Sequence, residues 1–482
     1  MTVLDRPRAV LAPVTVRPRG AVPALLALVA GLLRLPFVGT PLAPDEGRYL
    51  LVASQWRPGA STYGGYFVDR PPLLIGIFGL ADALGGGAAL RLIGVVGVVT
   101  SVLLAAAIGG RWSALAATVF LSTPLFGTTS VDGELLAVPF VLAGVLLVIR
   151  SARAPGTTSA RWLAIASGAC AGSAVLVKQN MVDALVFSLV VLLFRGIRDG
   201  WREAAGRAVC FVAGGGLVLA GALWIASRRG TSAAELWDSL VTFRAQAAAV
   251  IEAYSPSSTS ERFDLLLLSL AVSGAPLVVV AALLSARRPA DGVDVRWAGA
   301  AMVAWELAGA ALGGSYWPHY LIAVVPGLVV LVAAALPAGV ERSTGRWARR
   351  ALGVAAASSA IAVADLCLHP PGPGTDQEVA AYVRTHSSPG DTMVVAFGAP
   401  NIVHDAGLTS PYPHLWSLSV RVRDPDLTEL VDVLRSADPP RWVVSGTSLA
   451  TWGVREARGQ QVLDQHYREV MSAGDWHVLE RR

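Results

Sequence analysis

The sequence has 482 residues, of which 54% are hydrophobic and only 15% are charged, with a mean hydropathy of +0.55. Soluble proteins carry about 25% charged residues, so the composition excludes a purely soluble enzyme, a disordered chain and a collagen-like fibre. Three cysteines without metal-ligand spacing exclude a disulfide scaffold. The net charge of +5 comes from arginines in short loops between apolar runs, which argues against nucleic acid as a partner and indicates a polytopic membrane protein.

Eleven apolar runs are long enough to cross a membrane, since a helical span needs roughly 17–25 mostly apolar residues. They lie near residues 21–39, 91–109, 113–130, 134–150, 162–178, 180–195, 208–226, 263–285, 298–313, 320–338 and 351–368. The stretch 73–85 is also apolar, but it is short, rich in glycine and interrupted by Asp82. We therefore expect 73–85 to form an interfacial helix, and the rest to form an all-α membrane domain of about eleven helices.

Arginines are concentrated in alternate loops, with four in residues 1–20 and none in the loops 130–134 and 313–320. Because arginine-rich loops favour the cytoplasmic side, residues 1–20 are predicted to be a cytoplasmic tail and residues 21–368 the transmembrane domain. The first outer loop then covers residues 40–90. A twelfth span at 73–85 would invert this charge bias.

A linker rich in proline and glycine, residues 369–374, precedes a C-terminal segment of ordinary polar composition. Local patterns there predict a helix at 376–386, a strand at 392–397, a helix at 427–437, a strand at 441–445, a helix near 449–470 and a strand near 476–480. Residues 369–482 are therefore predicted to form a small exported α/β domain. This domain has no cysteine and needs no disulfide to stay folded outside the cell.

The first outer loop begins with two adjacent carboxylates, Asp45 and Glu46, just after the first span. On a helix that starts there, Asp45, Arg48 and Tyr49 share one face, because positions three and four apart are neighbours. Acidic residues after Pro44 are also typical of an ordinary helix start. The motif alone leaves both interpretations open.

The same loop contains Asp69 and Arg70 immediately before two prolines. Prolines cannot continue a helix and hold the preceding backbone extended. Arg70 could contact a lipid phosphate, because a guanidinium group matches phosphate with two hydrogen bonds. An arginine whose side chain merely reaches the membrane surface is an equally common interpretation.

Asp132 and Glu134 occupy the second outer loop, where acidic residues can also serve simply to complement a helix dipole. Together with Asp45 and Glu46 they would place four carboxylates on one side of the membrane. That arrangement suits an acidic site or a cation site.

Lys178 is the only lysine among 39 basic residues, and it lies at the outer end of a predicted span. Lysine is a compact charge with three donors, and an ionisable residue at membrane depth suggests a functional site. The alternative to a functional site is a lysine at a helix end whose side chain simply extends to the membrane–water interface. His319 and Tyr320 lie in an aromatic segment at the same side, where they could either form part of an interfacial belt or donate hydrogen bonds to an anion.

Four segments together resemble the bacterial C-type (GT-C) glycosyltransferases. They are Asp-Glu-Gly-Arg-Tyr at 45–49, Arg-Pro-Pro-Leu at 70–73, VDGELLAVPF at 131–140 and HYL at 319–321. The nearest groups are the protein O-mannosyltransferases and the lipid A aminoarabinose transferases. The resemblance implies a GT-C fold and an enzyme that moves a sugar, with inversion, from a polyprenyl phosphate to an acceptor hydroxyl at the outer face.

The resemblance also implies roles for individual residues. Asp45 would be the general base, and Glu46 would orient it or help to hold the acceptor. The donor phosphate would be bound by Lys178, Arg70, His319 and Tyr320. The acceptor or a divalent cation would be bound by Asp132, Glu134, Arg48, Tyr49 and Asp69. No cofactor is firmly implied.

The rival interpretation is a polytopic transporter or a flippase for lipid-linked sugars, and a non-catalytic partner in an envelope complex is a third. Transporters usually show repeated halves and a site at the membrane midplane, whereas this chain shows no repeat and clusters its ionisable residues at the outer ends, apart from Glu306 and Arg34. Abundant Ala, Arg and Val indicate a bacterium of high GC content. We therefore expect a plasma-membrane protein that uses mannose or arabinose donors and a glycan, lipid or protein acceptor.

Overall fold

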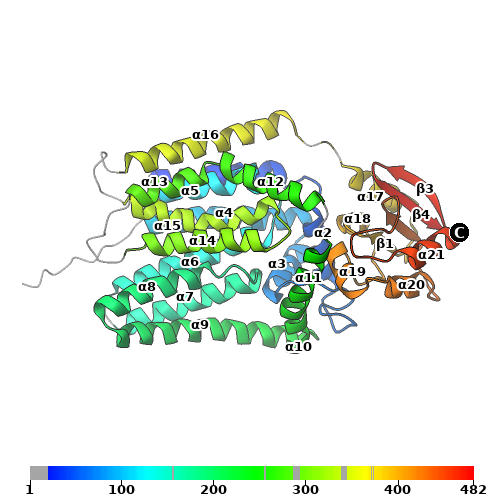
Figure 1. Cartoon of the computed structure of the whole chain (residues 1–482), viewed down its shortest axis with the longest axis horizontal. Helices are drawn as coiled ribbons and strands as arrows, with labels where there is room; N and C mark the ends of the chain where they lie inside the picture. Colours follow the sequence, from blue (N-terminus) through cyan, green and yellow to red (C-terminus); the bar gives the residue numbers. More distant parts are fainter. Residues whose placement is uncertain are drawn as a thin grey trace, which may run out of the picture.

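The computed structural model describes residues 20–154, 157–254, 257–285, 294–337, 345–370, 372 and 374–482. Long helices run side by side in a bundle, and a C-terminal α/β unit lies against one end of it (Figure 1). We call this end of the bundle the domain end. The predicted cytoplasmic tail lies outside the described residues except for Gly20, as do two residues of the predicted linker.

A helix is present in each of the eleven predicted apolar runs. The bundle helices are α1 (Ala21–Leu32), α4 (Gly87–Gly109), α5 (Arg111–Ser122), α6 (Gly133–Arg153), α7 (Thr157–Val177), α8 (Asp183–Asp199), α9 (Trp201–Arg228), α12 (Ser257–Val272), α13 (Ala275–Ser285), α14 (Arg296–Leu312), α15 (Val325–Ala335) and α16 (Arg346–Leu368). In the described part of the chain, six helices are long and apolar enough to span a membrane, or seven if α12 and α13 are one bent span. The chain is thus a multi-pass membrane protein, while the number eleven stays a prediction.

The predicted run 263–285 is broken rather than continuous. Residues Thr259–Val272 and Ala275–Ser285 meet at an angle of 47°. The break falls at Gly274, whose φ of +76° is a conformation that glycine adopts readily. The position also leaves little room for a side chain, because the Cα of Ala355 lies 3.0 Å from where a Cβ would be. Close packing against α16 therefore requires a glycine here.

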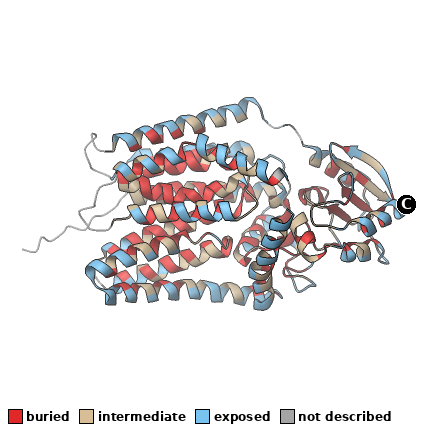
Figure 2. Ribbon diagram, viewed as in Figure 1, coloured by how far each residue is buried: buried red, intermediate tan, exposed pale blue. Residues whose placement is uncertain are grey.

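Burial separates inner helices from outer ones (Figure 2). In the most apolar window of each helix, 72% of the α6 residues are buried but only 11% of the α9 residues. Exposed apolar side chains such as Val212, Leu217 and Trp224 cover α9. A helix that buries little and exposes apolar residues all round is suited to contact with lipid.

Short helices fill the space between the bundle and the C-terminal unit. They are η1 (Leu35–Phe37), α2 (Pro44–Ser54), α3 (Pro72–Ala83), η2 (Pro124–Phe126), α10 (Ala233–Trp237), the π-helical turn η3 (Asp238–Thr242), α11 (Phe243–Ala253) and η4 (Pro318–Val324). The helix α3 coincides with the predicted interfacial helix. These connections bring the segments with predicted site residues to the domain end.

The C-terminal unit contains α17 (Thr375–His386), β1 (Met393–Ala396), α18 (Asn401–Asp405), α19 (Ser417–Arg423), α20 (Thr428–Leu434), β2 (Trp442–Ser445), α21 (Ala457–His466), β3 (Tyr467–Ala473) and β4 (Trp476–Arg481). Its sheet has the order β1-β2-β4-β3, in which only β1 and β2 are parallel.

One element of this unit was predicted wrongly. The predicted helix near 449–470 covers only α21, and its last residues belong to strand β3. Gly474, with a φ of +57°, and Asp475 make a two-residue turn between the paired residues Ala473 and Trp476. Such a turn pairs the flanking strands as a hairpin, and this pairing overrides the local helical pattern.

Candidate active site

Helix α2 presents Asp45 at the domain end of the bundle. The Arg48 guanidinium donates to Asp45 Oδ1 over 2.6 Å and to the Tyr49 hydroxyl over 2.8 Å, and that hydroxyl lies 3.5 Å from Asp45 Oδ2. The expected face of Asp45, Arg48 and Tyr49 therefore exists. The side chain of Asp45 is 38% exposed, whereas that of Arg48 is 5% exposed.

Glu46 points into the protein instead of toward this face. It is fully buried, and its carboxylate accepts hydrogen bonds from Ala43 N (2.9 Å), Val131 N (2.7 Å) and Arg91 (2.5 Å). Burial raises the pKa of Glu46, although Arg91 and the two backbone donors oppose that rise. Glu46 thus fastens α2 to α4 and to the loop before α6.

Asp69 lies beside the same face and binds two arginines. Its carboxylate pairs with Arg70 at 2.8 Å and with Arg244 at 2.9 Å, and its side chain is 2% exposed. Burial opposes ionisation, but Arg70 and Arg244 outweigh it and hold the pKa of Asp69 below its usual value. The guanidinium carbon of Arg70 lies 5.9 Å from the ring centre of Tyr49, which joins the two segments of the first loop.

Lys178 forms an ion pair with Glu134, whose side chain is 1% exposed. The Lys178 ammonium also lies 4.9 Å from the ring centre of Tyr320, within cation–π distance. Lys178 reaches this position over Gly133, where an added Cβ would lie 3.2 Å from its side chain. Residues from α6, the end of α7 and η4 therefore meet at one point.

Asp132 and His319 complete the cluster. His319 Nδ1 lies 3.9 Å from the Asp132 carboxylate, which also accepts a hydrogen bond from the Ser130 hydroxyl over 3.1 Å. Burial raises the pKa of Asp132, and nearby His319 opposes that rise. The ring centres of His319 and Tyr320 are 5.0 Å apart.

The charges of this cluster act on Asp45 in particular. Burial would raise the pKa of Asp45, but Arg48 and, to a smaller extent, Arg70, His319 and Lys178 together hold it below its ordinary value. Asp69, Asp132 and Glu134 are all buried. Asp45 is therefore an ionised and partly exposed carboxylate with several cationic partners.

The residues of the cluster do not assemble a metal site. Among the described residues, no group of three His, Cys, Asp or Glu side chains is placed to hold a metal ion. Asp69 and Glu134 instead use their oxygens on arginine and lysine. A divalent cation, which the sequence leaves open only as an alternative to the acceptor, therefore has no such group of ligands among the described residues.

Sequence reasoning missed four residues that the structure places at or near the site. Arg91 is the buried partner of Glu46, and Arg244 is the second partner of Asp69. Trp416, from the C-terminal unit, lies with its ring centre 4.2 Å from the guanidinium carbon of Arg48. Asp183 lies beside Glu306, the buried acid of α14. An arginine at the start of an apolar run was a usable signal for Arg91, whereas nothing local indicated Trp416.

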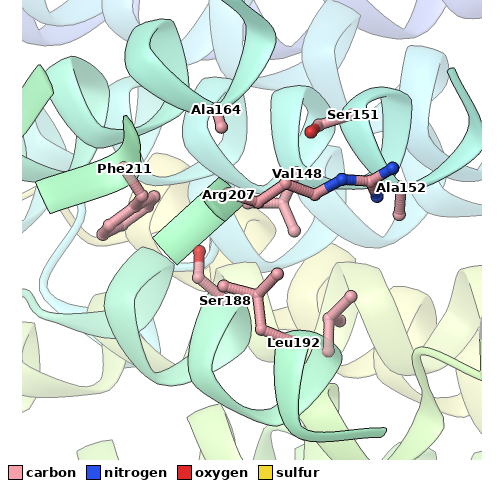
Figure 3. A pocket seen from close by; sticks show the side chains of 9 residues that line it. Val148, Ser151, Ala152, Ala164, Ser188, Leu192, Arg207 and Phe211 are labelled. Atoms are coloured by element: carbon pink, nitrogen blue, oxygen red, sulfur yellow. The ribbon is translucent and has the colours of Figure 1, made fainter. Parts of the chain in front are cut away.

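A small cavity elsewhere in the bundle is separate from this cluster (Figure 3). It lies among α6, α7, α8 and α9, toward the end of α6 opposite to Glu134. Its lining is mostly apolar, and the Arg207 guanidinium there pairs with Glu203. It has no carboxylate–cation arrangement comparable to that around Asp45.

Comparison with known proteins gives matches in structure but not in sequence. No family model and no curated protein matches the chain. ArnT from Cupriavidus metallidurans bound to undecaprenyl phosphate, a lipid A aminoarabinose transferase, is similar at 14% identity and a TM-score of 0.60, over 95% of this chain and 97% of that one. An oligosaccharyltransferase from Archaeoglobus fulgidus is similar at 12% identity and a TM-score of 0.57, over 93% and 72%. The chain has the GT-C fold.

The GT-C fold confirms the resemblance noted in the sequence. The match extends over the bundle and the C-terminal unit together, since it covers 95% of the chain. The apo form of ArnT gives the same TM-score of 0.60. At this level of identity the comparison establishes the architecture, and the roles of individual side chains have to be argued from their own geometry.

Proposed function

We propose that this protein is a membrane glycosyltransferase that moves a sugar from a polyprenyl-phosphate donor to an acceptor hydroxyl at the outer face of a bacterial plasma membrane. The observation that supports this most is Asp45, a partly exposed, ionised carboxylate among Arg48, Arg70, His319 and Lys178. The GT-C fold and its occurrence in a protein bound to undecaprenyl phosphate support the donor class.

Asp45 is proposed as the general base. The acceptor oxygen attacks the anomeric carbon, Asp45 takes the hydroxyl proton, and the bond between that carbon and the phosphate oxygen breaks with its electron pair leaving on the phosphate. One displacement inverts the anomeric centre. A positioned general base contributes about 10²–10⁴-fold to such a reaction.

The donor phosphate gains negative charge as it leaves, so donors are required around it. Lys178, Arg70, His319 and Tyr320 are proposed for this role, with Arg244 added from the structure. Lysine has three N–H donors and arginine five. The ion pairs of Lys178 and Arg70 with Glu134 and Asp69 therefore leave further donors for a phosphate.

The remaining residues are proposed to hold the acceptor or to position other groups. Arg48 and Tyr49 orient Asp45, and Asp132 is placed to accept a hydrogen bond from an acceptor hydroxyl. Glu46, Asp69 and Glu134 are buried in ion pairs and are proposed as positioning residues. Because Glu46 is fully buried, we propose that it does not contact the acceptor directly.

The arrangement in the membrane is also proposed. Residues 1–20 would be a cytoplasmic tail, residues 21–368 the transmembrane catalytic domain, and residues 369–482 an extracytoplasmic domain. The donor would be a mannose- or arabinose-type sugar, transferred as a hexosyl or pentosyl group. Membrane lipid would surround the exposed apolar faces of α9 and α16.

The decisive experiment is incubation of the purified protein with a panel of polyprenyl-phosphate sugars and measurement of released lipid phosphate. We expect release with at least one donor, and at least a 100-fold lower rate in Asp45→Asn. Asp82→Asn, which changes an exposed acid on α3, serves as the control with unchanged activity.

Two results would contradict this proposal. Full activity of a folded Asp45→Asn protein would remove Asp45 from the base role. Movement of the lipid-linked sugar between leaflets of a vesicle, without any release of lipid phosphate, would instead support the alternative of a flippase or transporter.

A further inference from the structure

A groove of about 550 Å³ lies between three segments that are far apart in the sequence. The first loop contributes Ser61, Thr62 and Phe67, the segment α10–η3 contributes Glu235 and Asp238, and the C-terminal unit contributes His414, Arg423 and Glu429. None of these groups takes part in the chemistry proposed at Asp45. The groove is open to solvent, and it is much larger than the cavity among α6 to α9.

Bonds between its walls hold the groove in shape. The Thr62 and Ser239 hydroxyls are 2.6 Å apart, and the Arg423 guanidinium pairs with Asp238 at 2.6 Å. Asp238 begins the π-helical turn η3, a rare conformation that occurs frequently at functional sites. The walls are thus fixed to one another before any ligand arrives.

The lining of the groove suits a ligand with many hydroxyl groups. The carboxylates of Asp238 and Glu429 are 46% and 49% exposed, and ionised carboxylates only accept hydrogen bonds. Ser61 and the Arg423 guanidinium supply donors beside them. Hydroxyl groups can donate to the first set and accept from the second, so a sugar satisfies both.

A residue of the protein already occupies the cation–π position in the groove. The guanidinium carbon of Arg423 lies 5.5 Å from the ring centre of Phe67 and 5.6 Å from that of Phe243, where it takes the cation–π position. The same guanidinium neutralises Asp238. A second cation would meet the charge of Arg423 at the place where it would otherwise bind.

Phe67, which lines the groove, is linked to the general base through Trp416 and Arg48. The rings of Phe67 and Trp416 are stacked, with centres 6.0 Å apart and an angle of 15°. Trp416 lies under Arg48, which holds Asp45. A ligand that reaches both the groove and Asp45 must therefore extend across this aromatic layer.

We propose that this groove is a subsite for an extended glycan acceptor, and that it binds sugars some residues away from the hydroxyl that reacts at Asp45. The inference rests on the proposed function for its place in the reaction. It also specifies the acceptor class, because a chain of several neutral sugars gains from the groove and a single sugar does not.

A matched pair of variants on α10 tests the subsite. Ala234 lines the groove and Ala233 does not, and both are exposed. Ala234→Trp would fill the groove, while Ala233→Trp adds the same side chain outside it. The full-length protein in detergent is probed by saturation-transfer NMR with neutral oligosaccharides of several residues, released by mild acid from the envelope of the bacterium that makes it.

We expect transfer signals from the oligosaccharides, a loss of more than 10-fold in Ala234→Trp, and unchanged signals in Ala233→Trp. Equal binding in the two tryptophan variants, no binding at all, or binding of pentalysine in place of the oligosaccharides would overturn the subsite. Binding is measured without a donor, so a failure of the proposed transfer reaction, seen as no release of lipid phosphate, would be recognised separately.

Discussion

Asp45 and Glu46 are neighbours in the chain but have different environments. Successive residues of a helix point about 100° apart, so one carboxylate faces the charged cluster while the other is buried against Arg91. The partly exposed group can meet a substrate, and the buried group can only hold the helix. The same separation explains why the pKa of Asp45 is lowered and that of Glu46 is raised.

The lowered pKa of Asp45 predicts the acid side of the pH profile. A general base must be ionised, so the rate falls as the pH drops through its pKa, and here that fall lies below the ordinary value of about 3.9. Arg48→Met removes the largest opposing charge and should move the acid limb upward by about one to three pH units. Transfer rates measured at closely spaced values between about pH 3 and pH 8 check this prediction.

The exposed Arg57, in the same loop, provides the control for this experiment. Arg57→Met should leave the profile unchanged. An acid limb at the same pH in Arg48→Met and in the unmodified protein would show that the measured limb does not report the ionisation of Asp45.

Lys178 is predicted to act on the donor. Lys178→Ala should raise the KM for the donor by at least about 10-fold, a larger effect than that of Lys178→Arg, because a charged donor to the leaving phosphate is lost. Removal of the lysine alone also leaves Glu134 buried without its partner, which destabilises a fold.

The double variant Lys178→Met with Glu134→Gln separates these two effects. It removes both charges of the ion pair, so we expect a melting temperature close to that of the unmodified protein but a donor KM as high as in Lys178→Ala. If the unmodified protein, Lys178→Ala and Lys178→Arg use the donor equally well, Lys178 has no role in donor binding, and its side chain merely extends to the membrane surface.

At the scale of elements, the C-terminal unit packs directly against the helix that holds the proposed base. A Cβ at Gly47 of α2 would lie 2.5 Å from the Cα of Asn401, at the start of α18. Trp416 of the same unit covers Arg48. The position of Asp45 therefore depends on a segment more than 350 residues later in the chain.

Gly47→Ala should displace α2 and reduce the transfer rate by at least about 10-fold, because an overpacked contact with backbone costs about 1–3 kcal/mol and is relieved only by movement. Gly76→Ala on α3 is the matched control, since a Cβ there meets nothing within 4 Å. Activity and thermal unfolding of both variants check this. Full activity in Gly47→Ala would mean that contact with α18 does not position Asp45.

The elements themselves were predictable to different degrees. The apolar runs predicted the places of the bundle helices, because burial in lipid or in a helix bundle requires continuous apolar sequence. The break at Gly274 and the strand β3 were not predictable locally. Both depend on a partner, α16 in one case and β4 in the other.

At the scale of the whole molecule, the predicted orientation can be tested with cysteine labels. In a background without Cys170, Cys210 and Cys367, a cysteine at Ser387 of the C-terminal unit should react with a membrane-impermeant maleimide in intact cells. Helix α9 starts at the end of the bundle away from the C-terminal unit (Figure 1). A cysteine at Arg202, in the first turn of α9, should therefore react only after permeabilisation. The arginine bias of the loops is the physical reason. Protection of the label at Ser387 would reverse the whole arrangement.

By itself, the sequence determined that this is a multi-pass membrane protein with a polar C-terminal segment, and it indicated a GT-C fold, because composition and apolar run length are local properties. It also identified Asp45, Lys178 and Asp132 as residues of interest. Only the tertiary structure decided which of them meet. The ion pairs of Glu46 with Arg91 and of Asp69 with Arg244, and the contact of Trp416 with Arg48, join distant segments, and such contacts depend on how helices and loops pack.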